Sequence, residues 1–248
     1  MVEVIGHRGS SKKAPENTIA AVQLAFFENA DGVEVDVRLT KDKELVCIHD
    51  KDTLRTAGHK ILILETQLKN LKTLDVGLWK DKRWKGETIP TLSEVLDKIP
   101  KKKKIFIEVK EGVESIEPLI RDIQESKLEY DQITVISFNE EVVTKIKQAA
   151  HQYSVNLLVH FEDGPVANEG IIKRLFKSNL DGVGVQNHSY LTADFVDPIL
   201  KEGKKVHVWT VDDIDKAKSY GKMGLSSCLL YTSPSPRDLS TSRMPSSA

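Results

Sequence analysis

Apolar and polar positions along this chain divide it into short segments of two kinds. Runs rich in valine and isoleucine, such as residues 2–5 and 105–110, have the composition of buried strands. Over residues 32–37 the pattern has a period of two, so that valines face one side of a strand and carboxylates the other. Ile19 and Val22 then begin a helical spacing. Strands and helices therefore follow one another from the start of the chain.

The second half of the chain repeats this strand–helix unit with short links. Strands and helices alternate over residues 133–138, 139–153, 155–161, 168–178, 182–185, 192–202 and 205–211, and a further helix opens at residue 212. Repeated units of this kind predict an α/β fold, a TIM-type (β/α)8 barrel whose functional residues lie at the carboxyl ends of its strands.

The segment after the second strand departs from this repeat. Residues 45–48 form another strand, and the link to it is so short that an antiparallel hairpin is required. The hairpin brings His49 back beside Glu34 and Asp36. Residues 51–88 carry a weaker pattern, which fits a small insertion over a site as well as a plain connection.

Paired carboxylates on an interior strand are the first chemical signal. Glu34 and Asp36 share one face of a β-branched strand that should be covered on both sides. Two such acids repel each other and lose hydration unless a cation or hydrogen bonds compensate. A divalent metal is the favoured interpretation, and a structural arrangement is the alternative. Glu108 and Lys110, two residues apart on a later strand, bring a third carboxylate and a cation to the same end of the fold.

The turn after the first strand is the second signal. That strand delivers His7 and Arg8 into a turn flanked by Gly6 and Gly9. Glycine allows backbone angles and close ligand approach that other residues prevent. A titratable imidazole beside a fixed cation suits a phosphate ester, whereas the alternative is a solvated strand end with two polar residues.

Bulk composition narrows the class of protein. The 248 residues carry a net charge of -1, with 40% hydrophobic and 29% charged residues, so neither a nucleic-acid surface nor an anionic membrane is favoured as a partner. Cys47 and Cys228 are too few for a disulfide framework or a zinc knuckle. The start of the chain lacks a signal-peptide pattern and no run has the length of a membrane span, so we expect a cytoplasmic protein without stable membrane insertion.

Several short segments together resemble the glycerophosphodiester phosphodiesterase family. They occur in the family's order, at residues 7–9, 15–18, 34–37, 49–50, 108–110, 137–138 and 207–211. No single segment is specific, but the ordered set is, and it covers most of the chain.

The resemblance implies a phosphodiesterase barrel that binds one divalent cation, Mg²⁺ or Ca²⁺, and hydrolyses glycerophosphodiesters to glycerol 3-phosphate and an alcohol. By matching position it implies three sets of residues, for the metal, for acid–base catalysis, and for phosphate and substrate: Glu34, Asp36 and Glu108; His7 and His49; and Arg8, Lys110 and Trp209.

The end of the chain departs from the family pattern. A closing strand is expected after the last helix, but residues 223–248 lack α/β periodicity and become rich in serine and proline. We therefore expect a barrel domain over residues 1–222, with residues 223–248 as a disordered or non-native tail. A short closing strand at residues 228–231 is the weaker alternative. Without that strand the barrel would have a gap beside its first strand, at a cost in stability and activity.

The substrate and the proton-transfer steps stay open at the level of sequence. The same barrel could act on lysophospholipid-type phosphodiesters, or it could be a catalytically silent truncated barrel. The attacking group could be water or the glycerol 2-hydroxyl, and either histidine could be the acid.

Overall fold

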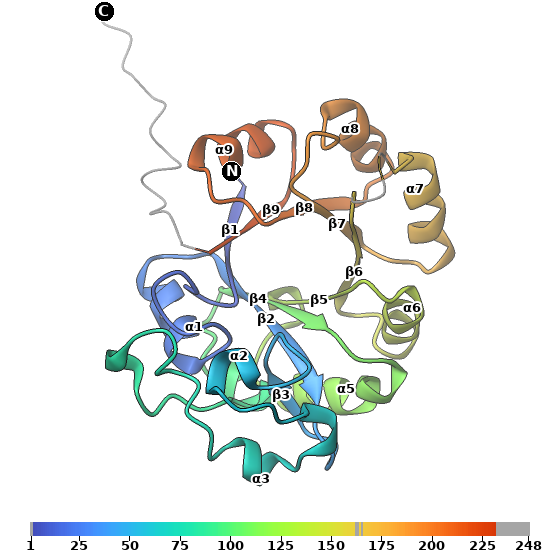
Figure 1. Cartoon of the computed structure of the whole chain (residues 1–248). Coiled ribbons are helices and arrows are strands. Elements are labelled where there is room, and N and C mark those ends of the chain that lie inside the picture. Colours follow the sequence, from blue (N-terminus) through green and yellow to red (C-terminus); the bar gives the residue numbers. More distant parts are fainter. Residues whose placement is uncertain (1, 162–163, 165, 232–248) are drawn as a thin grey trace, which may run out of the picture.

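Eight parallel strands close into a barrel in the computed structural model, which describes residues 2–161, 164 and 166–231 (Figure 1). The barrel strands are β1 (Glu3–His7), β2 (Gly32–Leu39), β4 (Lys104–Val109), β5 (Ile133–Ser137), β6 (Ser154–Val159), β7 (Gly182–Gln186), β8 (Lys205–Trp209) and β9 (Ser227–Leu230). Each pairs in parallel with its neighbours, and β1 pairs with both β2 and β9, so the sheet is closed. The TIM-type barrel predicted from the sequence is confirmed.

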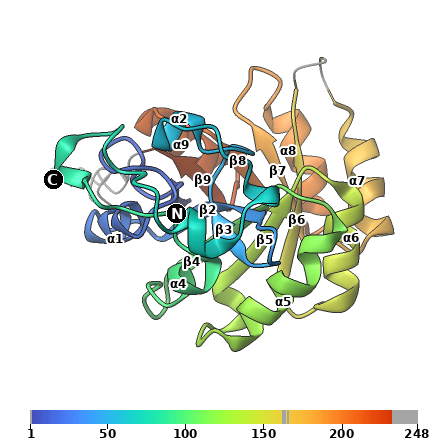
Figure 2. The ribbon, with the colours of Figure 1, turned by 60° about the horizontal axis from the view of Figure 1, so that its bottom comes forward.

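Helices cover the outside of the barrel. They are α1 (Ile19–Phe27), α4 (Leu92–Leu96), α5 (Ile116–Glu125), α6 (Glu140–Ala149), α7 (Asn168–Lys177), α8 (Ala193–Lys201) and α9 (Ile214–Lys222). Figure 2 shows α5 to α8 outside the strands of the second half. Val33, Val35 and Val37 lie in the apolar core with these helices, whereas Glu34 and Asp36, also fully buried, alternate with them on the inner face. The described part of the chain holds no helix with the length and apolar character needed to cross a bilayer.

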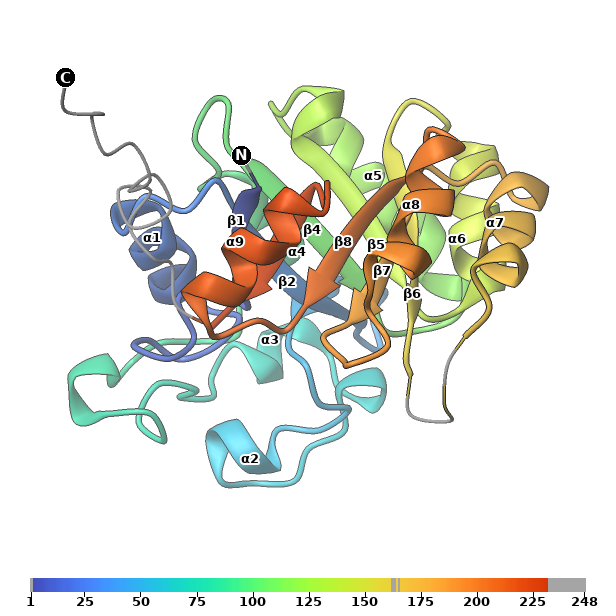
Figure 3. The same ribbon diagram turned by 90° about the horizontal axis from the view of Figure 1, so that it is seen from above.

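A small insertion follows β2 in the chain and packs outside the barrel. It comprises β3 (Leu45–Cys47), α2 (Leu54–Ala57), η1 (Ile63–Glu65), α3 (Leu68–Leu71) and η2 (Lys82–Trp84). β3 runs antiparallel to β2, as the short link predicts. A second apolar core, which includes Val46, Ile63 and Leu71, packs the insertion together. In Figure 3, α2 and α3 lie on the side toward which the barrel strands point, so the insertion borders the carboxyl ends of the strands.

The closing strand corrects the expected boundary at residue 222. β9 pairs with β1 from Glu3↔Ser227 to Gly6↔Leu230 and with β8 at His207↔Ser227. All four β9 residues are buried. Two neighbouring strands supply hydrogen-bond partners, so a run this short forms a strand although its sequence departs from the expected pattern. The barrel is therefore closed through residue 230, close to the strand at residues 228–231 that was the weaker alternative. Residues 232–248 of the expected tail lie outside the described residues.

An apolar layer divides the barrel interior into two compartments. It is built from five buried side chains, Ile5, Phe106, Ile136, Leu158 and Leu229. On the amino-terminal side, His207 is fully buried, and a Cβ on Gly184 would lie 2.1 Å from its Nε2. Glycine is therefore required at position 184, because the imidazole occupies the space of a side chain. The polar residues singled out in the sequence lie on the other side of the layer.

Candidate active site

The turn after β1 holds one edge of the site. Arg8 and Gly9 have φ of 58° and 76°, in the left-handed region. A Cβ on Gly9 would lie 2.5 Å from the carbonyl carbon of Ala21, so only glycine lets the turn pack on α1. The turn directs the Arg8 backbone N–H to Glu34 Oε2, to which it donates over 3.0 Å. The glycine turn thus couples the first strand to the acidic residues of the second.

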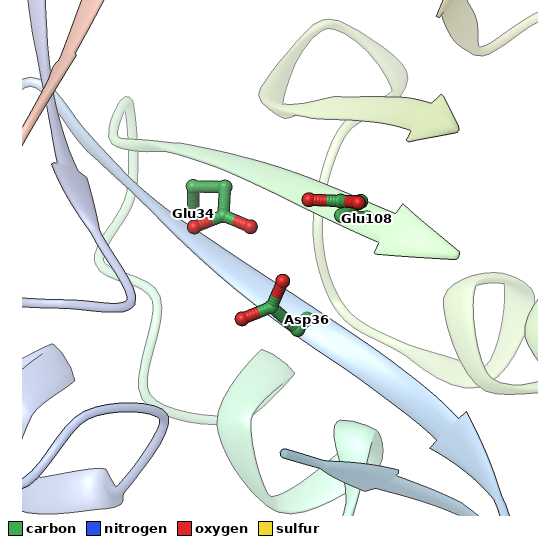
Figure 4. Close-up of side chains that lie close together, drawn as sticks. All are labelled: Glu34, Asp36 and Glu108. Carbon is green, nitrogen blue, oxygen red and sulfur yellow. The ribbon is translucent and has the colours of Figure 1, made fainter. Parts of the chain in front are cut away.

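Three buried carboxylates meet inside the barrel. Glu34 and Asp36 come from β2, and Glu108 comes from β4 directly opposite Asp36 in the strand register. Ligand atoms of all three lie within 4.8 Å of one another, and Figure 4 shows their oxygens gathered between the two strands. Glu34 Oε1 is buried without a hydrogen-bond partner in the described residues. Oxygen donors in this arrangement fit a hard divalent cation.

The pKa values of these three carboxyl groups are shifted in different directions. Burial raises the pKa of Glu34 well above its ordinary value, and Asp36 and Glu108 add to the effect. The pKa of Glu108 is raised to about 7, first by burial and then by Asp36. Burial also opposes ionisation of Asp36, but Lys110 and Arg8 hold the pKa of that carboxyl below its ordinary value. Glu34 and Glu108 are thus harder to ionise than free carboxyl groups, and an added cation would favour their ionised forms.

Two cations border the acidic group. Arg8 Nε lies 3.1 Å from Asp36 Oδ2, and Lys110 Nζ lies 2.9 Å from Asp36 Oδ1 and 2.6 Å from Glu108 Oε1. Burial opposes their charge, but Asp36 leads the interactions that raise the pKa of both cations. Arg8 and Lys110 therefore stay charged, and both also line a cavity beside the acidic group.

The two histidines have different surroundings. His7 is buried, with Nε2 3.7 Å from Glu34 Oε2 and Nδ1 3.4 Å from Thr210 Oγ1. Burial, followed by Arg8, lowers the pKa of His7 to about 3. His49 is partly exposed, and its Nδ1 lies 2.8 Å from Asp50 Oδ1. Burial, with a contribution from Arg8, lowers its pKa as well, so both imidazoles are neutral near pH 7.

A cavity of about 190 Å³ joins these groups. His7, His49 and Glu108 belong to its polar wall. The opposite wall is apolar and aromatic: Phe138 and His160 stack with ring centroids 4.2 Å apart, and Trp209 stands nearly perpendicular to both rings. These two walls fit a ligand that carries charge at one end and apolar surface at the other.

The structure brings together every site residue that the sequence singled out. Six of them line the cavity, namely His7, Arg8, His49, Glu108, Lys110 and Trp209, and two lie beside it, Glu34 and Asp36.

Sequence reasoning missed the part played by Asn17. Its amide donates to Asp36 Oδ2 over 2.8 Å and accepts from the Asp36 backbone N–H over 3.0 Å, so Asn17 fixes that carboxylate. The adjacent Thr18, not Asn17, caps α1 by accepting from Ala21 N. The segment at residues 15–18 was the available signal, but the partner across the turn could not be read from it.

The acids, cations and imidazoles lie at the carboxyl ends of the strands, where (β/α)8-barrel enzymes have their active sites, so the fold and the site are those of a barrel enzyme. Within that class, the chain belongs to the glycerophosphoryl diester phosphodiesterase family, whose sequence profile matches residues 7–230. It is therefore a phosphoric diester hydrolase.

Individual relatives agree with this assignment. The chain is 34% identical over 227 residues, 90% of each chain, to a glycerophosphodiester phosphodiesterase of Caldanaerobacter subterraneus subsp. tengcongensis. Its fold matches a phosphodiesterase of Oleispira antarctica in complex with the product sn-glycerol-3-phosphate, with a TM-score of 0.88, 28% identity and 97% of each chain covered. It also matches the glycerophosphodiester phosphodiesterase of Thermotoga maritima, with a TM-score of 0.79, 26% identity and 94% and 96% of the two chains covered.

Proposed function

We propose that this chain hydrolyses glycerophosphodiesters to glycerol 3-phosphate and a free alcohol, with a divalent cation bound at its acidic group. One observation carries the proposal: a single cavity borders a buried, incompletely neutralised carboxylate group, two cations and two neutral imidazoles. The solved Oleispira antarctica relative in complex with sn-glycerol-3-phosphate supports the same product class.

Glu34, Asp36 and Glu108 would hold the cation, Mg²⁺ or Ca²⁺, since both prefer oxygen ligands. When bound, the cation supplies positive charge that stabilises negative charge developing on the phosphate. Arg8 and Lys110 act on the same charge from the protein side, because both are charged and line the cavity. A phosphate held by Arg8 and Lys110 would lie in the cavity that His7 and His49 also line.

His7 and His49 divide the proton transfers: the neutral ring of one accepts the proton of the attacking oxygen, and the other, which takes up a proton beside the anionic phosphate, delivers it to the leaving alkoxide. Asp50 fixes the tautomer of His49. Although burial opposes it, Arg55 and His49 hold the pKa of Asp50 at about 2, so this carboxylate can only accept. Neutral His49 must therefore donate through Nδ1, which leaves the lone pair on Nε2 for proton transfer.

The aromatic wall suits the organic part of the substrate. Phe138, His160 and Trp209 offer ring surface opposite the charged wall. A cavity of about 190 Å³ has the scale of a headgroup alcohol, so a lysophospholipid would have to place its acyl chain outside it. Small glycerophosphodiesters are therefore the favoured substrates.

The test is release of glycerol 3-phosphate from glycerophosphocholine, after EDTA treatment and after return of Mg²⁺ or Ca²⁺, with lysophosphatidylcholine assayed in parallel. We expect cation-dependent turnover that favours glycerophosphocholine. His7→Ala and His49→Ala should each lower turnover by roughly 10²-fold or more. Full activity in EDTA would remove the cation from the proposal, and near-normal activity of either variant would remove that histidine.

A further inference from the structure

The insertion helix α2 places one arginine between two segments of the site. Arg55 Nε donates to Asp50 Oδ2 over 2.7 Å, while Nη1 and Nη2 donate to Glu16 Oε2 and Oε1, each over 2.8 Å. Glu16 lies in the loop between β1 and α1, and Asp50 follows β3. Arg55, which lies in α2, thus connects the loop after β1 to the segment after β3.

One branch of these contacts leads to His49. Asp50 uses one carboxylate oxygen for Arg55 Nε and the other for His49 Nδ1, at 2.7 and 2.8 Å. A carboxylate held at one oxygen has less freedom to turn, so the direction of the bond to the imidazole is held as well. Orientation of the His49 ring therefore depends on Arg55 through Asp50.

The other branch leads to Arg8. Glu16 Oε1 accepts from Arg8 Nη1 over 3.0 Å, and Arg8 Nε lies 3.1 Å from Asp36 Oδ2. Glu16 thus accepts from two guanidinium groups, one on the cavity wall and one on the insertion. The position of the phosphate-facing Arg8 depends on Arg55 through Glu16.

A surface ion pair that makes no further contacts to a functional site contributes little to stability, typically less than about 1 kcal/mol. The Arg174–Glu140 pair is an example, with Nε and Oε2 2.7 Å apart between α7 and α6. The Arg174 side chain is 38% exposed and the Arg55 side chain 40%, so the two arginines are matched in solvent contact. They differ in that Arg55 binds two carboxylates, and each of those binds a residue of the cavity wall.

We propose that Arg55 is a positioning residue. Through Asp50 it holds the orientation of the His49 ring, and through Glu16 it holds the position of the Arg8 guanidinium, so that a residue of the insertion positions groups in the active site of the barrel. This inference rests on the proposed function, because it assigns Arg55 a part in that reaction. The planar guanidinium suits the role, since its donors leave in fixed directions toward two carboxylates. Its carbon Cζ also lies 5.6 Å from the centroid of the Trp79 ring, which supports it within the insertion.

The first test compares Arg55→Gln with Arg174→Gln in steady-state kinetics and thermal unfolding. We expect Arg55→Gln to lower kcat by about 10- to 100-fold, because small displacements of catalytic groups have effects of that size. The melting temperatures of the two variants should stay close to each other. Arg55→Lys should recover only part of kcat, because one ammonium group cannot reproduce the fork. Equal kinetics for Arg55→Gln and Arg174→Gln would overturn the proposal.

A double-mutant cycle separates positioning from general loss of structure. Asp50→Asn and Arg55→Gln should be strongly non-additive in kcat, because both remove the same restraint on His49. Additive losses in kcat would show that Arg55 does not act through Asp50 and would overturn that branch.

A readout independent of turnover distinguishes failure of this inference from failure of the proposed function. The ring ¹⁵N signals of His49, assigned with His49→Ala, should indicate the Nδ1–H tautomer in the wild-type chain and in Arg174→Gln. They should move toward a mixture of tautomers in Arg55→Gln. If the wild-type chain releases no glycerol 3-phosphate, the proposed function fails while this measurement still tests the restraint on His49. Unchanged His49 signals in Arg55→Gln overturn the inference in either case.

Discussion

A divalent cation should stabilise this chain more at pH 8 than at pH 5. The physical reason lies in the buried acids Glu34 and Glu108, whose pKa values are raised in the metal-free chain by burial and by neighbouring carboxylates. At pH 5 these carboxyl groups are protonated, so protons compete with the cation for the same oxygen atoms. At pH 8 Glu108 is ionised beside the other two buried acids, so a cation relieves an unfavourable interaction.

Glu108 sets the scale of the effect. Its pKa is raised from 4.5 to about 7, so the folded chain binds more protons than the unfolded chain between these pH values. Metal-free stability therefore falls as pH rises through that window, by up to about 3 kcal/mol from this one group. A cation at 100 times its Kd returns about 2.7 kcal/mol, which for a chain of this size is about 5–11 °C in Tm.

The assay is thermal unfolding of EDTA-dialysed protein at pH 5 and pH 8, with and without saturating Mg²⁺ or Ca²⁺. Glu108→Gln is the control, because it removes a charge while keeping the shape of the side chain. We expect this variant to have a higher Tm than wild type in EDTA at pH 8 and a smaller response to cation. Equal cation responses at the two pH values, or an unchanged response in Glu108→Gln, would refute the reasoning.

Three further predictions concern stability. Burial lowers the pKa of His207 to about 3 from 6.5, so the unfolded chain binds the extra proton and stability is lost as pH falls from 6.5 toward 3; Tm should fall less steeply in His207→Asn, and parallel Tm–pH curves would contradict this. Gly184→Ala places a methyl group 2.1 Å from His207 Nε2 and 2.6 Å from a Leu158 methyl carbon, and should cost about 1–3 kcal/mol in denaturant unfolding; an unchanged midpoint would show that the ring moves freely. Thr91→Ala removes the side-chain cap of α4 and should cost about 1 kcal/mol by the same measurement, whereas no loss would mean that the cap is replaced by water.

Local patterns in the sequence were sufficient for much of the fold and of the site. Alternation over residues 32–37 separated the outward valines from the inward Glu34 and Asp36, because side chains of a strand point to opposite faces. The short link before β3 required a hairpin, and β3 is indeed antiparallel to β2, which returns His49 to the site. These inferences succeed because they depend on neighbours within a few residues.

Long-range contacts determine features that no local pattern encodes. Arg55 meets Glu16 across 39 residues of sequence, and it lies in a segment with weak periodicity. The sequence offers a closing strand only as the weaker alternative, because residues 223–248 depart from the expected pattern, yet pairing with β1 and β8 makes Ser227–Leu230 a strand. In both cases the deciding partner is distant along the chain, so tertiary structure overrides the local signal.

The apolar layer across the barrel has a consequence for traffic through the enzyme. Ile136, Leu158 and Leu229 form part of the floor of the catalytic cavity, while Phe106 lines a separate polar cavity at the amino-terminal end. Ions and water meet a hydrocarbon barrier between these two chambers. Molecules that enter or leave the catalytic cavity therefore do so at the carboxyl ends of the strands, the side on which the insertion lies. A molecule that remains at this end of the barrel therefore blocks the next one, because the apolar layer offers no exit on the other side.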